Sequence, residues 1–214
     1  MFIVGLDLGQ KQDYTAVAVV EKEERGIEEK PMLYLRHLER YALATPYGEQ
    51  MDRVTALVQK IKGRGRFACP QHPHLIANPP RQPELIVDAT GVGLGVIEML
   101  KDRGLEYRAV TITSGNVQSR SGGIYHVPKR ELVSRAVAPF EGKRLKIARG
   151  MRLIPELVKE LETFKVKVNI RTAHDSYEAW RETDHDDLVL ALALACWWAE
   201  RRSGVWIIPK PVGF

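Results

Sequence analysis

Cysteine is scarce in this sequence, and long apolar runs do not occur in it. The 214 residues include two cysteines, Cys69 in a proline-rich stretch and Cys196 in an alanine-rich one, so a disulfide framework of the secreted kind is not expected. No run approaches the ~18 consecutive apolar residues that cross a bilayer, and no basic stretch leads into a signal-type segment. We therefore expect a soluble protein of the reducing cytoplasm, without a membrane partner.

The chain also lacks a phosphate-binding loop and a strong charge imbalance. No GxxxxGK[ST] motif occurs, because GVGLGV at 91–96 carries neither the lysine nor the hydroxyl. The net charge is +5 and the pI about 9.2. This moderate basicity is consistent with a polyanionic partner such as nucleic acid. It fits a basic protein without a charged partner equally well, so the net charge does not separate the two. The length suits a single domain.

Acidic residues mark the ends of three apolar runs that lie far apart in the sequence. Asp7 follows FIVGL, Asp88 follows ELIV, and the acidic group 184–187 precedes LVLALALA. The first two runs predict buried strands and the third predicts a helix start, so folding could bring these acids to one edge of a sheet. Carboxylate oxygens are the ligands that Mg²⁺ and Mn²⁺ prefer, so the pattern predicts a divalent-metal site.

A simpler explanation exists for each acid taken alone. Asp7 could close a turn before Gly9, and an aspartate before a helix is an ordinary N-cap. One aspartate satisfies a cap, however, whereas Asp184, Asp186 and Asp187 exceed that need. The spacing does not decide which of the three binds metal, and we favour Asp187.

Hydrophobic periodicity predicts a mixed sheet with helices on both faces. The expected strands are 2–8, 14–21, 32–41, 85–88 and 107–113, with an edge strand at 165–174. The expected helices are about 45–62, one within 91–104, 148–164 and 187–200, and the segment 129–147 is expected to be a helix followed by a short strand. The stretch 113–128 is expected to be a loop or hairpin. The basic, proline-rich segment at about 63–84 is expected to be an insertion in a domain spanning 1–204, and 205–214 a C-terminal tail.

Four blocks of the sequence together resemble a known nuclease family. GLDLGQKQDYTAVAVV, LIVDATGVG, VPKRELVSRAVAPFEGKRLKI and HDDLVLALALA are similar, in this order, to the nuclease domain of the large terminase subunit of tailed bacteriophages, in the ribonuclease H-like superfamily that also holds RuvC-type resolvases. The resemblance implies a ribonuclease H-like α/β fold with a five-stranded mixed sheet, three antiparallel strands followed by parallel ones. It also implies an endonuclease that cuts double-stranded DNA with two divalent cations, Mg²⁺ or Mn²⁺, in the host cytoplasm.

The resemblance further implies roles for particular residues. Asp7, Asp88 and Asp187 would be the catalytic, metal-binding carboxylates, with Asp184 or Asp186 as a further metal ligand. Lys129 opens a helix, and a cation near the metals would stabilise the charge of the pentacovalent phosphate. The basic residues that we expect to contact DNA, each of which could instead be ordinary solvated surface, are Arg64, Arg66, Arg81, Arg120, Lys129, Arg130, Lys165 and Lys167.

Several alternatives remain open at this point. A complete terminase subunit also has an ATPase motor, so the sequence is either an excised nuclease domain or a stand-alone relative, for which a packaging ATPase or a portal could be a separate partner. A RuvC-type resolvase fits the same residues. A kinase of the actin-like ATPase superfamily needs two such domains, for which 214 residues are too few, and retained acids argue against a non-catalytic DNA- or portal-binding module. Cys69, His72 and His74 lack the fourth ligand of a structural zinc site.

Overall fold

The computed structural model describes residues 1–9, 13–25, 29–63, 82–92, 94–171 and 186–201. The strands within these residues are β1 (Phe2–Asp7), β2 (Ala16–Glu23), β3 (Met32–Arg40), β4 (Glu84–Asp88), β5 (Arg108–Thr113), β6 (Ser119–Ser121), β7 (Ile124–Pro128) and β8 (Leu145–Ile147). The helices are α1 (Tyr47–Gly63), α2 (Leu94–Asp102), α3 (Lys129–Glu141), α4 (Ile154–Arg171) and α5 (Asp187–Ala199). No helix in this part of the chain is long and apolar enough to cross a bilayer.

All the strands belong to one mixed sheet in the order β6-β7-β5-β4-β1-β2-β3-β8. The pairs β1–β2 and β2–β3 are antiparallel, and β4, β5 and β7 follow β1 as parallel neighbours. This confirms the predicted fold class, a ribonuclease H-like mixed sheet. The predicted number of five strands is wrong, because eight occur in the described residues. Strand β7 pairs with β5 and β8 pairs with β3, so backbone groups of β5 and β3 that would otherwise lie unpaired at sheet edges are satisfied, and β6 in turn pairs with β7.

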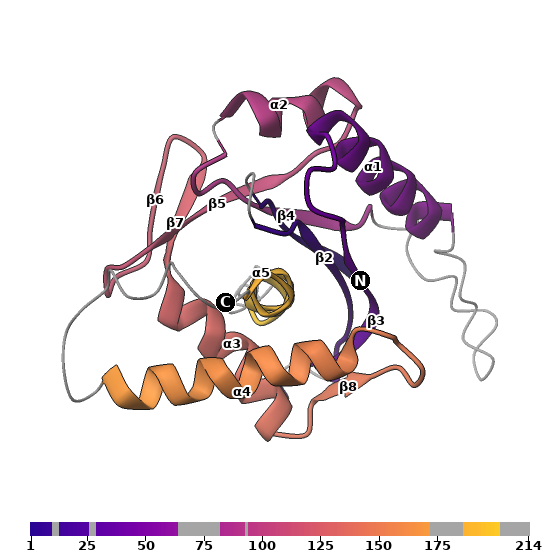
Figure 1. The fold of residues 1–214 in the computed structure, drawn as a ribbon. Coiled ribbons are helices and arrows are strands. Elements are labelled where there is room, and N and C mark those ends of the chain that lie inside the picture. Colours follow the sequence, from indigo (N-terminus) through magenta and orange to yellow (C-terminus); the bar gives the residue numbers. More distant parts are fainter. Residues whose placement is uncertain (10–12, 26–28, 64–81, 93, 172–185, 202–214) are drawn as a thin grey trace, which may run out of the picture.

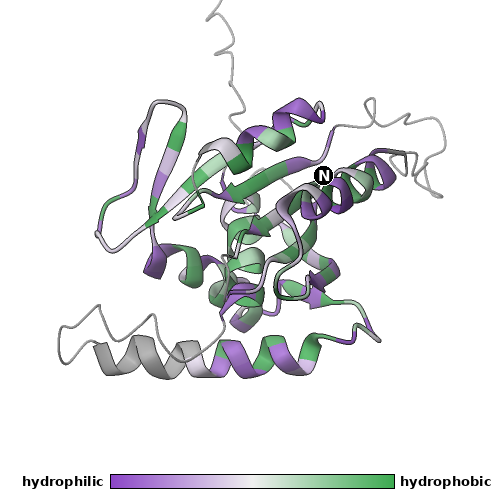
Figure 2. Cartoon of the chain, turned by 45° about the horizontal axis from the view of Figure 1, so that its top comes forward, coloured by the Kyte–Doolittle hydropathy of each residue, from purple (hydrophilic) through white to green (hydrophobic). Residues whose placement is uncertain are grey.

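The two faces of the sheet are covered by different helices. Figure 1 shows α1 and α2 on one side, and α5 between the sheet and the outer helices α3 and α4 on the other. Side chains of β1 alternate accordingly: Val4 and Leu6 join a cluster with Met51 and Ile97, whereas Ile3 packs in the cluster that contains α5. Figure 2 shows hydrophobic residues concentrated in the strands and the central helix, with hydrophilic ones on the outer helices.

Helix α5 lies directly against the sheet backbone at Gly5. The helix is apolar on all sides, as its sequence DLVLALALACWWA predicts for a buried core helix. A Cβ atom added to Gly5 would lie 2.0 Å from the carbonyl oxygen of Ala191, so this position requires glycine. The small residues Ala191 and Ala195 of α5 let the helix backbone approach the sheet this closely. Gly5 lies two residues before Asp7, so the contact also seats α5 near the end of β1.

The edge strand predicted at 165–174 is wrong for the part that the structure describes. Helix α4 continues to Arg171, and Pro155 lies in its first turn, where proline is tolerated. Neither glycine nor proline follows Pro155 within the helix, so nothing stops it before the alternating segment KVKVNIR. The predicted hairpin, by contrast, forms as β6 and β7, and both residues of its tight turn, Gly122 and Gly123, have positive φ (57° and 84°).

Candidate active site

Asp7 and Asp88 lie side by side at one edge of the sheet. They end the parallel neighbours β1 and β4, in which Leu6 is opposite Val87, so both side chains leave the sheet at the same place. Their exposed fractions are 8 % and 6 %, and the two carboxyls hydrogen-bond to each other. Asp88 Oδ1 also accepts a hydrogen bond from the Thr90 amide at 2.8 Å. The structure therefore brings these two predicted residues together.

The protonation of this pair reflects burial and crowding. Burial raises the pKa of Asp7 well above its ordinary value, and the nearby carboxylates of Asp88, Asp186 and Asp187 raise it further. Burial also raises the pKa of Asp88, although hydrogen bonds from Thr90 and the charge of Lys129 act in the opposite direction. A second positive charge at this edge would relieve the repulsion.

The amino end of α5 adds two acids from the third predicted group. Asp186 is the N-cap residue, yet its side chain makes no capping hydrogen bond and instead contacts Lys129 Nζ at 2.5 Å. Asp187 is the first residue of the helix and is 5 % exposed. Lys129, the first residue of α3, therefore lies at the acidic edge as expected, whereas Asp184 lies outside the described residues.

Arg40 links Asp187 to a further buried acid, Glu160 of α4. Arg40 Nε donates to Asp187 Oδ2 at 2.6 Å, and its Nη2 donates to Glu160 Oε1. Glu160 Oε2 in turn accepts a hydrogen bond from the amide of Val189, in the first turn of α5, at 3.1 Å. Burial, together with the charge of Asp187, raises the pKa of Glu160 to about 7, against the lowering effect of Val189 and Arg40.

Sequence reasoning missed both Arg40 and Glu160. Arg40 is opposite Ala16 in the β2–β3 pair, and Ala16 is opposite Asp7 in the β1–β2 pair, so these residues share one row across the sheet. Only pairing of the strands reveals that row. Glu160 had a signal in the sequence: it lies three residues after the buried Leu157, on the apolar face of α4, where a carboxylate is unusual.

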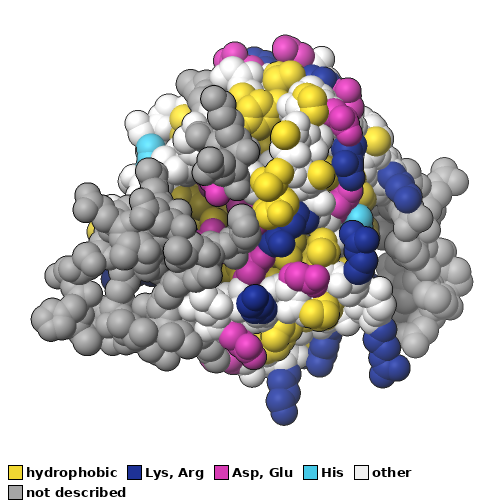
Figure 3. Space-filling view, viewed as in Figure 1, with side chains coloured by type: hydrophobic (Ala, Val, Ile, Leu, Met, Phe, Trp, Pro, Cys, Tyr) yellow, Lys and Arg dark blue, Asp and Glu magenta, His cyan; other side chains and the backbone are white. Residues whose placement is uncertain are grey.

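The donor chemistry of this edge fits a divalent cation, but two of its four acids, Asp186 and Asp187, are paired with basic residues. Within the described residues, no group of three or more Asp, Glu, His or Cys side chains is arranged to hold a metal ion. Buried, mutually repelling carboxylates are the hard oxygen donors that Mg²⁺ and Mn²⁺ require. Here Lys129 and Arg40 contact Asp186 and Asp187. Figure 3 shows acidic and basic side chains next to one another near the centre of the face that it draws.

The predicted DNA contacts are distributed more widely. Arg120 is exposed, and its guanidinium lies 4.7 Å from the ring centre of Tyr125, which packs on Trp197 at the other end of α5. The exposed Arg130 follows Lys129 directly and donates to the Asn116 carbonyl at 3.4 Å. The remaining expectations fall outside the described residues or side chains: Arg64, Arg66, Arg81, Lys165, Lys167, the zinc-like residues 69–74, the insertion 64–81 and the tail 205–214.

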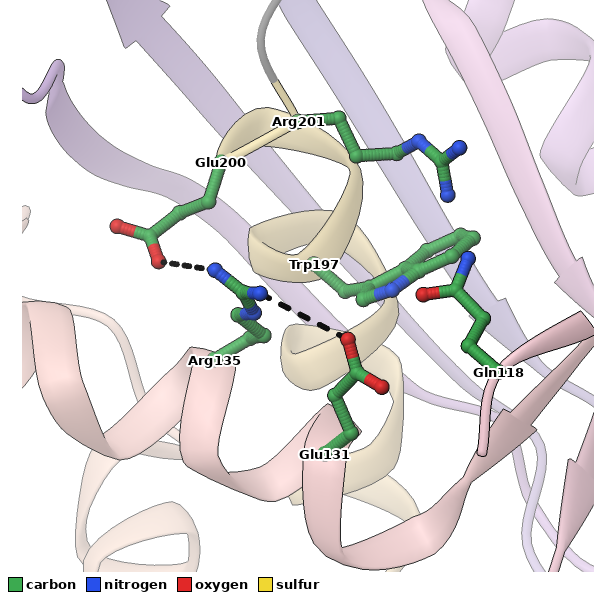
Figure 4. A pocket seen from close by; sticks show the side chains of 6 residues that line it. All are labelled: Gln118, Glu131, Arg135, Trp197, Glu200 and Arg201. Atoms are coloured by element: carbon green, nitrogen blue, oxygen red, sulfur yellow. Dashed lines mark ion pairs between the residues drawn. The ribbon is translucent and has the colours of Figure 1, made fainter. Parts of the chain in front are cut away.

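A pocket of about 270 Å³ lies at the carboxyl end of α5, away from the acidic edge. Arg135 stands between Glu131 and Glu200, at 3.7 Å and 3.6 Å, as Figure 4 shows. The guanidinium of Arg201 lies 4.9 Å from the ring centre of Trp197. Three charged groups of this pocket, Arg135, Glu131 and Glu200, thus already pair with one another, and the pocket lies at the opposite end of α5 from the acidic edge.

Comparison with known proteins gives a family and a fold. Residues 76–197, more than half of the chain, match the family model of the terminase RNaseH-like domain. The chain is similar to the crystal structure of the large terminase nuclease from thermophilic phage G20c, with 19 % identity, a TM-score of 0.52, and coverage of 91 % of this chain and 80 % of that one. At this low identity, the structural similarity shows a shared fold and no more.

Two further solved structures are similar at lower scores. The human cytomegalovirus terminase nuclease domain, soaked with Mn and bound to an inhibitor, has 13 % identity, a TM-score of 0.49 and coverage of 94 % of this chain and 83 % of that one. RuvC of Thermus thermophilus has 17 % identity, a TM-score of 0.41 and coverage of 95 % and 98 %. No curated protein sequence matches. From the family match, we conclude that the chain belongs to the family of terminase RNaseH-like domains.

Proposed function

We propose that this chain is a metal-dependent endonuclease that hydrolyses phosphodiester bonds of double-stranded DNA. The observation that carries the proposal is the pair Asp7 and Asp88, buried side by side at the ends of parallel strands and facing the acidic amino end of α5. The family match supports the same reading, since its members are terminase domains. A negative island in a basic protein suits a catalyst that holds cations and draws in a polyanion.

The acids would hold the ions and the rest of the edge would position them. Asp7, Asp88 and Asp187 are the proposed ligands, with Asp186 or Asp184 as a further one. Two bound Mg²⁺ or Mn²⁺ ions would supply the charge that activates a water molecule and stabilises the leaving oxygen. The parallel pairing of β1 and β4 fixes the spacing of Asp7 and Asp88, and the seating of α5 on Gly5 fixes the approach of Asp187.

Lys129 would act on the phosphate itself. Its ammonium contacts Asp186 at 2.5 Å and lies close enough to lower the pKa of Asp88. A cation held there would stabilise the negative charge that develops on the phosphate oxygens. Exposed Arg130 follows it in α3 and would contact the DNA backbone, and we extend that role to Arg120 and to the basic residues 64, 66 and 81.

The surroundings of this activity follow from the same proposal. The nuclease unit would span residues 1–204, with a separate packaging ATPase or portal as partner and the host cytoplasm as its place of action. The span of the unit, its partner and its place of action all depend on the resemblance to terminases.

Cleavage of a supercoiled plasmid tests the proposal. The wild-type protein should nick and linearise the plasmid with Mn²⁺ or Mg²⁺ and should be inactive with EDTA. Asp88→Asn should abolish cleavage because it removes a metal ligand, whereas Asp102→Asn, an exposed acid of α2, should cut normally. DNA binding without cleavage by the wild-type protein would favour a non-catalytic module, and preferred cutting of four-way junctions would favour a resolvase.

A further inference from the structure

Glu160 and Arg40 lie behind Asp187 and have no explanation in the proposed chemistry. Arg40 comes from the end of β3 and Glu160 from the middle of α4, more than a hundred residues away, and both meet Asp187 at the start of α5. The side chains of Arg40, Glu160 and Asp187 are 18 %, 8 % and 6 % exposed. A buried ion pair of this kind seldom adds much to stability, so its presence beside a candidate ligand needs another reason.

Glu160 performs a task that the N-cap residue leaves undone. Asp186 makes no side-chain cap, because its carboxylate contacts Lys129. The carboxylate of Glu160 accepts a hydrogen bond from the amide of Val189 instead, so α4 caps α5 from outside the helix. This contact fixes the first turn of α5, which carries Asp187, relative to the sheet.

The charges of the three residues show what the arrangement preserves. Arg40 alone would orient Asp187 but would also cancel its charge and weaken its attraction for a cation. Glu160 supplies a second negative charge on the other side of the guanidinium. The three groups together therefore carry a net charge of about −1 when Glu160 is ionised.

We propose that Arg40 and Glu160 are positioning residues for Asp187, in which Arg40 holds the carboxylate and Glu160 offsets the charge of Arg40. Asp187 is thereby oriented and keeps its negative charge for a divalent cation. This inference rests on the proposed metal site. Groups behind the ligands of a metal commonly change its affinity by about 10–100-fold, which sets the size of the effect to expect.

A set of charge variants tests the inference through metal binding alone. The full chain is titrated with Mn²⁺ in a calorimeter without DNA. The titration is run at pH 8, which lies above the pKa of Glu160 of about 7. Glu160→Gln keeps an acceptor for Val189 but leaves the charge of Arg40 unbalanced, so Mn²⁺ should bind about tenfold more weakly. The double variant with Arg40→Gln removes both charges, so it should bind Mn²⁺ more tightly than Glu160→Gln, but less tightly than the wild type because Arg40 no longer holds Asp187. Glu162→Gln, an exposed acid of α4, should match the wild type.

This partial recovery separates the charge effect of Glu160 on Arg40 from a purely structural role of the pair. If the pair only supported folding, the double variant would bind no better than Glu160→Gln, and the inference would be overturned. Equal affinity of Glu160→Gln and wild type would also overturn it while leaving the metal site intact. Failure of the wild type to bind Mn²⁺ would overturn both proposals together.

Arg40→Lys provides a second measurement should Glu160→Gln fail to fold. A single ammonium cannot reproduce the fork that contacts both carboxylates, so Mn²⁺ should bind about threefold to tenfold more weakly, despite the unchanged charge. Arg36→Lys is its matched control, because Arg36 lies on the same strand and pairs with Glu21 on the exposed surface. Unchanged affinity of Arg40→Lys would contradict the proposal.

Discussion

The two ends of helix α5 carry opposite balances of charge. Among the described residues, carboxyls outnumber cations at the amino end, where Asp7, Asp88, Glu160, Asp186 and Asp187 lie near Arg40 and Lys129. Arginines outnumber carboxyls at the carboxyl end, where Arg135, Arg144 and Arg201 lie near Glu131 and Glu200. The helix dipole favours this distribution at both ends but is worth only about 0.3–1 kcal/mol per charge.

The two ends differ in how their buried acids are compensated. At the carboxyl end Glu200 is 7 % exposed and contacts both Arg144 and Arg135, so its burial is compensated. At the amino end Asp7 is equally buried, but its nearest partners include other acids, and its pKa is raised. A fold that can balance a buried acid at one end of α5 has no structural need for the excess at the other. The excess is what a cation-binding site would require.

The largest expected effect is at the amino end of α5, where one substitution should lower activity and raise stability. Asp7→Asn should reduce plasmid cleavage by about a thousandfold, since losing a metal ligand removes several kcal/mol of transition-state stabilisation. The same change should raise the melting temperature of the metal-free protein, because it removes a repelling carboxyl next to Asp88. Cleavage assays and thermal unfolding in EDTA measure both. A lower melting temperature would mean that the acidic pair is structural after all.

The next effect concerns the contact that seats α5 between its two ends. Gly5→Ala places a Cβ 2.0 Å from the Ala191 carbonyl oxygen, so the helix must move or the fold must strain. We expect a loss of about 3 kcal/mol, or roughly 6–12 °C in melting temperature. Gly95→Ala, in α2 with no neighbour within 4 Å, should instead be neutral or slightly stabilising. Equal effects of the two variants would show that α5 is not held by this approach.

A change at the carboxyl end should affect stability alone. Arg144→Gln removes the 2.5 Å contact to Glu200 and leaves that buried acid with Arg135 at 3.6 Å. Unfolding should become easier by about 2 kcal/mol, because a buried charge loses its closer partner. Cleavage and Mn²⁺ affinity should remain at the wild-type level. A loss of cleavage in a protein that is still folded would break the distinction between the two ends.

The sequence was sufficient to predict the acids that end strands. It did not predict the residues that come together only because strands pair. Asp7 and Asp88 were predictable because each follows a continuous apolar run, and such runs form adjacent buried strands. Arg40 was not, because β3 pairs with β2 through a register shift at Val19 and Val20, which alternation along β3 does not reveal. Its place in the row with Asp7 appears only once the strands are paired.

The same limit applied to α4 and to the edges of the sheet. The alternation of KVKVNIR fits period two, but a helix already under way continues until a residue stops it, and this segment has none. A short strand was expected after the helix in 129–147 and a loop or hairpin at 113–128, and β8 and the β6–β7 hairpin form there. The sequence did not define their ends, because a strand of three residues carries little pattern. Local pattern predicted the fold class, and long-range pairing determined the details.

The smallest expected effect is a pH dependence that belongs to the amino end. In the folded protein the pKa of Glu160 is about 7, and the pKa values of Asp7 and Asp88 are raised, whereas unfolded carboxyls titrate near pH 4. The folded state therefore holds more protons than the unfolded state above that pH, and stability falls as pH rises from about 4.5 through 7.

In EDTA, the melting temperature at pH 5.5 should exceed that at pH 8 by about 3 °C or more, the shift produced by about 1 kcal/mol in a domain of this size. Asp7→Asn should reduce the difference, because one of the protonated groups is gone, whereas Arg144→Gln at the other end should leave it unchanged. A wild-type melting temperature that is independent of pH in this range would mean that the amino-end acids ionise without penalty, and that the two ends of α5 differ in residue count but not in energy.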